Sequence, residues 1–200
     1  MPKIIGIDCD DTLSETLDQV LKHPRFVKNG IRKDDLTHSY ELYENPKLSQ
    51  VWIDKEWAIK VYYDFFLSDD YWNIQPVAWA LEKLQELKSQ WHTCILVTGR
   101  AAAIHEKTKQ WVQQHFPGIF DSFLFSNHNI ENEIPKSELC KQMGVEVMIE
   151  DNQDFVSDVS QHGIPCFLLD KPRNQRCIYE KDSWVIKVKS WEGIDLSLLL

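Results

Sequence analysis

Short apolar runs alternate with segments of helical periodicity along most of this chain, and this alternation constrains the fold more than any other feature of the sequence. The strand-like runs occupy residues 3–8, 92–97, 122–125, 145–149 and 166–170. Helix-like segments occupy residues 75–90, 102–116, 136–143 and 153–162. Strands joined by helices of this length form right-handed βαβ units. The sequence therefore predicts an α/β fold, in which helices cover both faces of a parallel sheet.

The ends of these segments carry residues that are typical of helix boundaries. Pro76 stands near the start of the segment 75–90, where proline is tolerated. Gly144 and Gly163 each follow a helical segment, as expected for residues that end a helix. Further on, residues 171–183 are predicted to form a loop, and WVIKVK at 184–189 predicts one more edge strand.

Residues 13–75 interrupt the alternation between the first strand and the next helix. This stretch is too long for a plain crossover and holds no strong β-run, so we expect a small, mainly helical insertion. The predicted organisation is a core made of 1–12 and 76–200, with the insertion 13–75 as a second, smaller unit.

Net charge and hydropathy exclude several classes of partner. The 200 residues include 22 Lys and Arg against 31 Asp and Glu, which gives a formal net charge of −9. That charge disfavours a nucleic-acid polymer or an anionic membrane as the main partner. No apolar run approaches the roughly 20 residues of a membrane span, and the N-terminus does not resemble a signal peptide.

Cysteine usage suggests a reducing compartment. The chain has five cysteines without CxxC spacing, which argues against both a structural zinc site and a secreted disulfide framework. We therefore expect a cytoplasmic protein in which the cysteines that lie in or beside apolar runs are small buried hydrophobic residues.

Chemically reactive side chains gather where the predicted strands end. Six carboxylates follow the first strand and the strand 145–149: Asp8, Asp10, Asp11, Glu150, Asp151 and Asp154. The strand 92–97 leads into Thr98, Gly99 and Arg100. In an open α/β sheet the carboxyl ends of the strands form the ligand-binding edge. So many acids at one edge require a counter-charge, and a hard divalent cation such as Mg²⁺ is the natural one.

Four motifs occur in the order that characterises phosphatases of the haloacid dehalogenase (HAD) superfamily: IIGIDCDDTL, LVTGR, PKSELC and MIEDNQD. The resemblance covers residues 3 to about 170. It implies a HAD-like Rossmannoid sheet, with the insertion 13–75 as a helical cap between the first two motifs. The position of the insertion, together with Ser190 and Trp191 near the C-terminus, most resembles the cytosolic 5′(3′)-deoxyribonucleotidase branch.

The resemblance implies a hydrolase that works through an aspartyl phosphate. Asp8 would be the nucleophile, and Asp10 the acid that protonates the leaving oxygen and then activates water. An acid at position 10 separates this chain from dehalogenases, which lack one there, and from transport ATPases, which carry a Lys-Thr pair after the nucleophile. Thr98, Gly99 and Lys136 would bind the phosphoryl oxygens.

The resemblance also implies a Mg²⁺ site. Asp8, the backbone carbonyl of Asp10 and Asp151 would bind the metal, and Glu150 and Asp154 would support it through water or a hydrogen bond. Because Glu150 stands where a second Asp is commoner, the direct ligand among Glu150, Asp151 and Asp154 is open, and we favour Asp151.

Simpler interpretations accompany several of these residues. Asp10, Asp11 or Asp154 could each cap a following helix, and for Asp11 a cap or turn role is the expected one. Arg100 could reach substrate or pair with Glu150 or Asp154. Cys94 and Arg100 match the C-x5-R pattern of cysteine-based tyrosine phosphatases, but Cys94 lies in a β-branched strand rather than in a phosphate-binding loop, which argues against that mechanism.

The insertion concentrates rings and basic residues. Residues 52–72 hold eight aromatic side chains, for most of which we expect a role in the insertion's own core, and for one or two a place beside a flat substrate group. Five basic residues lie within 22–33 without an intervening acid, and form either a solvated surface or an attraction for an anionic substrate.

Three substrates remain open: a nucleoside monophosphate, phosphotyrosine on a protein, and a small sugar phosphate. A deep pocket closed by the insertion would favour the nucleotide, and a shallow mouth with a basic rim would favour the phosphoprotein. An inactive HAD-fold binding module is the alternative outside enzymes. The intact set of Asp8, Asp10, Thr98, Lys136 and Asp151 argues against it.

Overall fold

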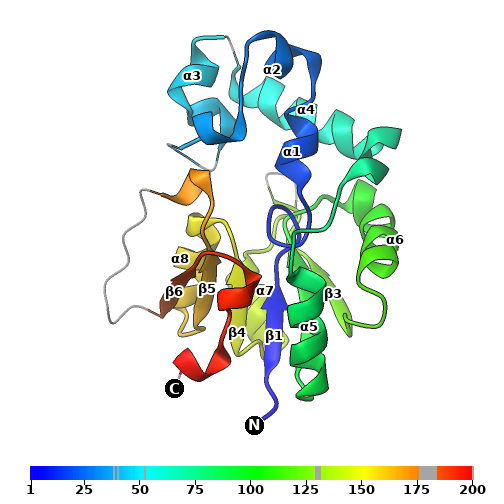
Figure 1. Ribbon diagram of the computed structural model, residues 1–200, viewed down its shortest axis with the longest axis vertical. Coiled ribbons are helices and arrows are strands. Elements are labelled where there is room, and N and C mark those ends of the chain that lie inside the picture. The colour runs from blue at the N-terminus through cyan, green and yellow to red at the C-terminus, as the bar shows by residue number, and fades with distance from the viewer. Residues whose placement is uncertain (38, 40, 52, 129–131, 176–183, 200) are drawn as a thin grey trace.

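The computed structural model describes residues 1–200 except 38, 40, 52, 129–131, 176–183 and 200, and at its centre is a six-stranded sheet (Figure 1). The strands are β1 (Ile4–Ile7), β2 (Thr93–Thr98), β3 (Ser122–Phe125), β4 (Val147–Glu150), β5 (Cys166–Leu169) and β6 (Val185–Val188). All neighbours pair in parallel, in the order β3-β2-β1-β4-β5-β6. The α/β prediction is confirmed, and so is the edge strand, which is β6.

Four helices of the core connect these strands. They are α5 (Ala80–Ser89), α6 (His105–His115), α7 (Lys136–Gln142) and α8 (Gln153–Gln161). The helix predicted from residue 75 begins only at Ala80, because Trp79 adopts the left-handed conformation (φ 67°) and Val77 N–H donates to the carbonyl of Leu13 instead of entering a helix. The helix predicted at 102–116 starts as a 3₁₀ turn, Ala102–Ile104, before α6.

Alternate side chains of the strands enter two different hydrophobic clusters, one on each face of the sheet. Ile5 and Ile7 of β1 belong to the cluster that includes Leu84 of α5 and Trp111 of α6. On the opposite face, Val97, Met148 and Cys166 pack with residues of α7 and α8. Helices therefore cover both faces, as the apolar strands require.

The insertion between β1 and α5 is helical where the structure describes it. Its helices are α1 (Thr16–Val20), α2 (Pro24–Lys28), α3 (Pro46–Ser49) and α4 (Lys55–Leu67), with 3₁₀ turns at Lys33–Asp35, Leu42–Glu44 and Asp69–Asn73. They bury a separate cluster that includes Leu17, Phe26, Leu36, Leu48 and Val61. Figure 1 shows these helices above the carboxyl ends of the strands. The boundaries 13 and 75 remain a prediction.

One end of α4 is held to the core by a single lysine. Lys107 of α6 donates to the carbonyl oxygens of Phe66 at 3.1 Å and Ser68 at 2.7 Å, where α4 ends. A cation at a helix C-terminus satisfies carbonyls that have no partner within the helix and complements the helix dipole. Trp111 adds a hydrogen bond from Nε1 to the carbonyl of Ile74 at 3.1 Å.

None of the helices in the described part of the chain is long and apolar enough to cross a membrane. Four cysteines are free thiols buried in the interior: Cys9, Cys94, Cys140 and Cys166. Their burial agrees with the expectation of small hydrophobic residues, whereas the fifth, Cys177, lies outside the described residues.

Candidate active site

The carboxyl ends of β1, β2 and β4 converge below the insertion, and the reactive side chains named from the sequence follow them. Asp8 comes directly after β1, and its backbone N–H donates to the carbonyl of Ile149 in β4 at 3.0 Å. Glu150 is the last residue of β4, and Asp151 follows it. The exposed fractions of Asp8, Glu150 and Asp151 are 4%, 1% and 1%, so the core of this site is closed to solvent.

Lys136 joins two of these acids. It is the first residue of α7, it is 1% exposed, and its Nζ donates to Asp8 Oδ1 at 2.5 Å and to Glu150 Oε2 at 2.7 Å. Burial and the neighbouring Glu150 raise the pKa of Asp8, although Lys136 opposes them. One ammonium group is therefore shared by two buried carboxylates, which leaves negative charge to be neutralised.

The third acid has an oxygen with no hydrogen bond. Asp151 Oδ1 accepts from the hydroxyl of Thr12 at 3.2 Å, but its Oδ2 is buried without a hydrogen-bond partner. Burial, followed by the charge of Asp11, raises the pKa of Asp151 well above its ordinary value. The Arg173 guanidinium lies 3.7 Å from Oδ2, too far for a hydrogen bond, so this buried oxygen is available to a bound cation.

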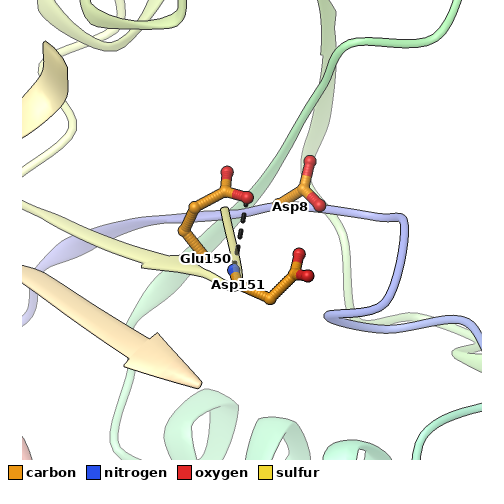
Figure 2. Close-up of side chains that lie close together, drawn as sticks. All are labelled: Asp8, Glu150 and Asp151. Carbon is orange, nitrogen blue, oxygen red and sulfur yellow. Dashed lines mark hydrogen bonds between the residues drawn. The ribbon is translucent and has the colours of Figure 1, made fainter. Parts of the chain in front are cut away.

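The geometry of the three acids fits a hard cation. Asp8, Glu150 and Asp151 each offer an oxygen, and these oxygens lie within 4.8 Å of one another. Figure 2 shows the carboxylates of Asp8 and Asp151 directed into the same space, from β1 and β4 respectively. Because Glu150 also accepts from the backbone N–H groups of Asp151 and Asn152, Asp8 and Asp151 have the most freedom to bind an ion. An all-oxygen donor set of this kind suits Mg²⁺.

Asp10 is engaged with a different cation. Arg100 donates from Nη2 to Asp10 Oδ1 at 2.7 Å and from Nε to Oδ2 at 3.0 Å, and Thr16 Oγ1 donates to Oδ1 at 2.6 Å. Burial would raise the pKa of Asp10, but the Arg100 guanidinium and these hydrogen bonds outweigh it, so the pKa is lowered. The alternatives that paired Arg100 with Glu150 or Asp154 were wrong, because its side chain points across the strand end of β1.

Asp11 has two partners, one of which the sequence reasoning missed. Its Oδ1 accepts from the backbone N–H of Leu17 at 2.9 Å, which caps α1 as expected. Its other oxygen, Oδ2, accepts from Arg173, a residue that is 4% exposed. Nη2 of Arg173 also lies 3.7 Å from Asp151 Oδ2. Arg173 belongs to the 3₁₀ turn after β5. The rule that functional residues follow the carboxyl ends of the strands could therefore have identified it from the sequence.

The remaining residues of the predicted site occupy different positions. Thr98 is fully buried, and its Oγ1 accepts from the backbone N–H of Arg100 at 3.4 Å. Gly99 lines the cavity above the strand ends, and a Cβ there would meet His128 Cβ at 3.1 Å. Asp154 is not brought into the acidic cluster: it is exposed in the first turn of α8, where its N–H donates to Asn152 Oδ1.

A cavity of about 210 Å³ lies between the strand ends and the insertion. We call its charged lining residues from the core the floor: Asp8, Asp10, Asp11, Arg100, Lys136 and Arg173. We call its lining residues from the insertion, between 41 and 66, the wall: Glu41, Leu42, Ala58, Ile59, Tyr62, Tyr63 and Phe66. The floor is highly charged, whereas the wall is apolar or aromatic except for Glu41.

The aromatic residues of the insertion divide between packing and the cavity. Tyr62, Tyr63 and Phe66 line the cavity, which is more than the one or two expected. Trp57 packs on the insertion's own cluster, and Tyr71 is buried in the core cluster. The eighth ring, Trp52, lies outside the described residues.

The basic stretch 22–33 does not line this cavity. Lys33 pairs with Glu15 and Asp18, each at 3.0 Å, and Arg25 stacks over the ring of Trp57 at 4.6 Å. These contacts agree with a solvated surface rather than with an anion-binding rim. Cys94 is fully buried within β2, as the sequence predicted, and burial raises the pKa of its thiol to about 12, unlike a reactive thiolate.

Comparison with known proteins identifies the fold. No family model matches the sequence, and no curated relative matches it. Solved structures do match. One is provisionally named a phosphoglycolate phosphatase, from Lactobacillus delbrueckii subsp. bulgaricus, with 16% identity, 98% of each chain covered and a TM-score of 0.64.

Two further structures carry the same fold. A HAD-superfamily hydrolase of subfamily IA, variant 1, from Geobacter sulfurreducens has 12% identity over 99% of this chain and 96% of its own, with a TM-score of 0.61. CbbY from Rhodobacter sphaeroides, in complex with phosphate, has 13% identity over 96% of each chain, with a TM-score of 0.59. At such identities the likeness establishes a HAD-like α/β fold and leaves the activity to be argued from the site.

Proposed function

We propose that this protein is a Mg²⁺-dependent phosphomonoester hydrolase that forms an aspartyl phosphate on Asp8. The observation that carries the proposal is the buried set of Asp8, Lys136 and Asp151 at the strand ends beneath the cavity. Lys136 Nζ contacts Asp8 Oδ1 at 2.5 Å, and Asp151 Oδ2 lacks a hydrogen bond beside it. The likeness of the fold to a solved structure that is provisionally named a phosphoglycolate phosphatase adds support by analogy.

The acids divide the proposed reaction into two displacements. One carboxylate oxygen of Asp8 attacks phosphorus while the bond to the leaving oxygen breaks, and Asp10 gives a proton to that oxygen. Because Arg100 keeps Asp10 ionised in the free protein, this step requires that the bound phosphate raises the pKa of Asp10 and that Asp10 takes up a proton when the substrate binds. In the second step Asp10 takes a proton from water, whose oxygen attacks phosphorus and releases the Asp8 carboxylate with inorganic phosphate. Covalent catalysis of this kind replaces one difficult step by two easier ones.

Lys136, Gly99 and Thr98 would bind the phosphoryl group. Lys136 already contacts Asp8, so an anionic phosphate that approaches the nucleophile meets a buried positive charge. Gly99 lines the cavity, and Thr98 shapes this turn by accepting a hydrogen bond from the N–H of Arg100. Arg100 and Thr16 would hold the Asp10 carboxylate toward the leaving oxygen.

Mg²⁺ would be held by Asp8, the backbone carbonyl of Asp10 and Asp151, with Glu150 as a supporting hydrogen-bond partner. When bound, the ion supplies positive charge that offsets the repulsion between an anionic nucleophile and an anionic substrate. The buried oxygen of Asp151 favours this residue over Glu150 as a direct ligand. The exposed position of Asp154 leaves it, at most, a role through water.

We propose a substrate with a flat, uncharged leaving group. A nucleoside monophosphate is one candidate, and a smaller aromatic phosphomonoester fits the volume of the cavity better. A cavity of about 210 Å³ lies below the range of about 300–1,000 Å³ that is typical of sites for drug-sized ligands. Tyr62, Tyr63 and Phe66 line it, so that rings face any group attached to the phosphate. The insertion would act as a cap that sets this specificity. The basic stretch 22–33 does not line the cavity, so among the described residues it gives a phosphoprotein no basic rim there.

The test is Mg²⁺-dependent turnover of p-nitrophenyl phosphate, followed by a panel of a nucleoside monophosphate, a phosphotyrosine peptide and phosphoglycolate. We expect EDTA to abolish turnover and Mg²⁺ to restore it. Asp8→Asn should lower the rate at least about 10³-fold, because it removes the nucleophile. A wild-type protein that hydrolyses none of these compounds would instead support an inactive HAD-fold binding module.

A further inference from the structure

Two polar residues face each other across the insertion side of the cavity. Glu41 comes from the insertion and His128 from the loop after β3, and both line the cavity. His128 Nε2 lies 3.9 Å from Glu41 Oε1, and His128 Nδ1 lies 2.6 Å from Glu133 Oε1. The side chains of Glu41 and His128 are each 33% exposed. This pair is therefore accessible to a bound molecule while contacting both parts of the protein.

The ring of Phe155 connects this pair with the floor. Lys136 Nζ lies 4.2 Å from the centroid of the Phe155 ring, and the His128 ring stands edge-on to it with centroids 5.0 Å apart. Phe155 also lines the cavity. A substrate whose phosphate meets Lys136 would therefore extend its leaving group along Phe155 toward His128 and Glu41.

Each cation among the described lining residues already has an acidic partner. Lys136 binds Asp8 and Glu150, Arg100 binds Asp10, and Arg173 binds Asp11. Protonated His128 faces two acids, Glu41 and Glu133, so this part of the cavity stays negative even then. Asp154 also lies within electrostatic reach of this pair. Burial, followed by the charges of Glu41 and Glu44, raises the pKa of Asp154.

A second anionic group on a substrate would meet the negative charge of Glu41 and Glu133. The described lining residues offer it no cation that lacks an acidic partner. Bringing two like charges together weakens binding, and proteins use this repulsion to reject wrong ligands. We infer that Glu41, held by His128, is a specificity-determining residue that rejects phosphomonoesters whose leaving group carries a carboxylate or a second phosphate, and that admits those whose leaving group is uncharged. This inference rests on the proposed phosphatase function and deepens it.

The test compares two esters that differ in charge but hardly in shape, 4-carbamoylphenyl phosphate and 4-carboxyphenyl phosphate. The measured quantity is the ratio of their kcat/KM values. We expect wild type to prefer the carbamoyl ester, and Glu41→Gln to reduce that preference on the order of tenfold, as expected for one partly solvated charge repulsion. His128→Gln should increase the preference, because Glu41 then loses its opposing charge.

The matched control is Glu56→Gln, which removes the same charge from the insertion at an exposed position of α4 that does not line the cavity. It should leave the ratio as in wild type. The inference is overturned if wild type hydrolyses both esters and neither Glu41→Gln nor His128→Gln changes their ratio relative to Glu56→Gln. If wild type hydrolyses neither ester, with or without Mg²⁺, the proposed function fails and the inference falls with it.

Discussion

The floor and the wall of the cavity differ in how deeply their side chains are buried and in how they respond to substitution. On the floor, most charged groups are almost fully buried: Lys136 is 1% exposed, Arg100 3% and Arg173 4%. On the wall, the rings are partly solvated, and Tyr63 is 43% exposed. Buried charges tolerate little change, because removing one partner leaves another uncompensated. A half-solvated aromatic wall tolerates substitution and changes what binds rather than whether the protein folds.

The largest effect that this comparison predicts is at Lys136. Lys136→Met leaves Asp8 and Glu150 buried without their shared cation, which should lower the free energy of unfolding by about 3–5 kcal/mol. Phosphate release should fall at least about 10³-fold, because the charge beside the nucleophile is lost. Urea unfolding and initial rates on p-nitrophenyl phosphate measure both quantities.

The control for Lys136 is Lys88→Met, which breaks a solvated pair with Asp121 at 2.8 Å. It should cost less than about 1 kcal/mol, since exposed ion pairs contribute little. The double variant Lys136→Met/Glu150→Gln should recover part of the lost stability. Equal effects of the two single lysine variants on stability would contradict the description of the floor as a buried charge network.

The next effect concerns Arg173, which links three segments of the floor. Arg173→Met leaves Asp11 and Asp151 without this cation and should cost about 3 kcal/mol of unfolding free energy. The second change of a double-mutant cycle, Asp11→Asn, should restore much of that loss, because it removes the orphaned charge. If the two substitutions prove additive in urea unfolding, the pairing of Arg173 with Asp11 does not stabilise the fold.

The floor was largely predictable from the sequence, and the reason is local. Asp8 of the floor stands at a strand end, as do Glu150 and Asp151, which lie beside Lys136 and Arg173 of the floor. Apolar runs locate these strand ends to within one or two residues, and parallel strands bring them to one edge. Lys136 was found because motif order placed it at the start of a helix. The orphaned oxygen of Asp151, which decides between the candidate metal ligands, is visible only in three dimensions.

The partners of the charged groups and the lining of the wall were not predictable in the same way. Arg100 and Asp10 are 90 residues apart, and Arg173 and Asp11 are 162 apart, so no local pattern pairs them. Likewise, the run of rings in the insertion does not say which face of α4 meets the cavity. The packing of the insertion on the core selects Tyr62, Tyr63 and Phe66 and leaves Trp57 inside the insertion.

A smaller effect is expected from the wall. Tyr63→Ala should raise KM for an aromatic phosphomonoester about tenfold, in keeping with the loss of one ring contact, and leave KM for glycerol phosphate nearly unchanged. The matched control is Trp72→Ala, because Trp72 is similarly exposed, at 39%, but does not line the cavity. If both variants raise KM for the two esters alike, the wall does not recognise the leaving group.

The smallest effect is a pH dependence of stability at the junction of wall and core. The nearby Glu41 carboxylate raises the pKa of His128 above 6.5, burial opposes it, and Glu133 adds to the increase. The charged groups around this ring are Glu41, Glu133 and the nearby Asp154. A histidine whose pKa is higher in the folded protein than in the unfolded chain stabilises the fold. This stabilisation is complete below the pKa of the unfolded chain, 6.5, and is lost as the pH rises through the pKa of the folded protein. The difference in unfolding free energy between wild type and His128→Gln should therefore shrink from about pH 6 to about pH 8.5. Because the ring is one-third exposed, the change should stay below about 1 kcal/mol.

His115 of α6 provides the control of opposite sign. Burial lowers the pKa of His115, and its Nε2 is buried without a hydrogen-bond partner. A histidine with a lowered pKa stays neutral in the folded protein while the unfolded chain takes up a proton, so it destabilises the fold as the pH falls below 6.5. The unfolding free energy of wild type minus that of His115→Gln should thus decrease as the pH falls. The unfolding free energy of wild type minus that of His128→Gln should decrease as the pH rises. Urea unfolding of the three proteins at about pH 5.5, 7 and 8.5 separates the two slopes. Slopes of the same sign would mean that Glu41 and Glu133 do not hold His128 in its charged form, and that the insertion is joined to the core on this side by packing alone.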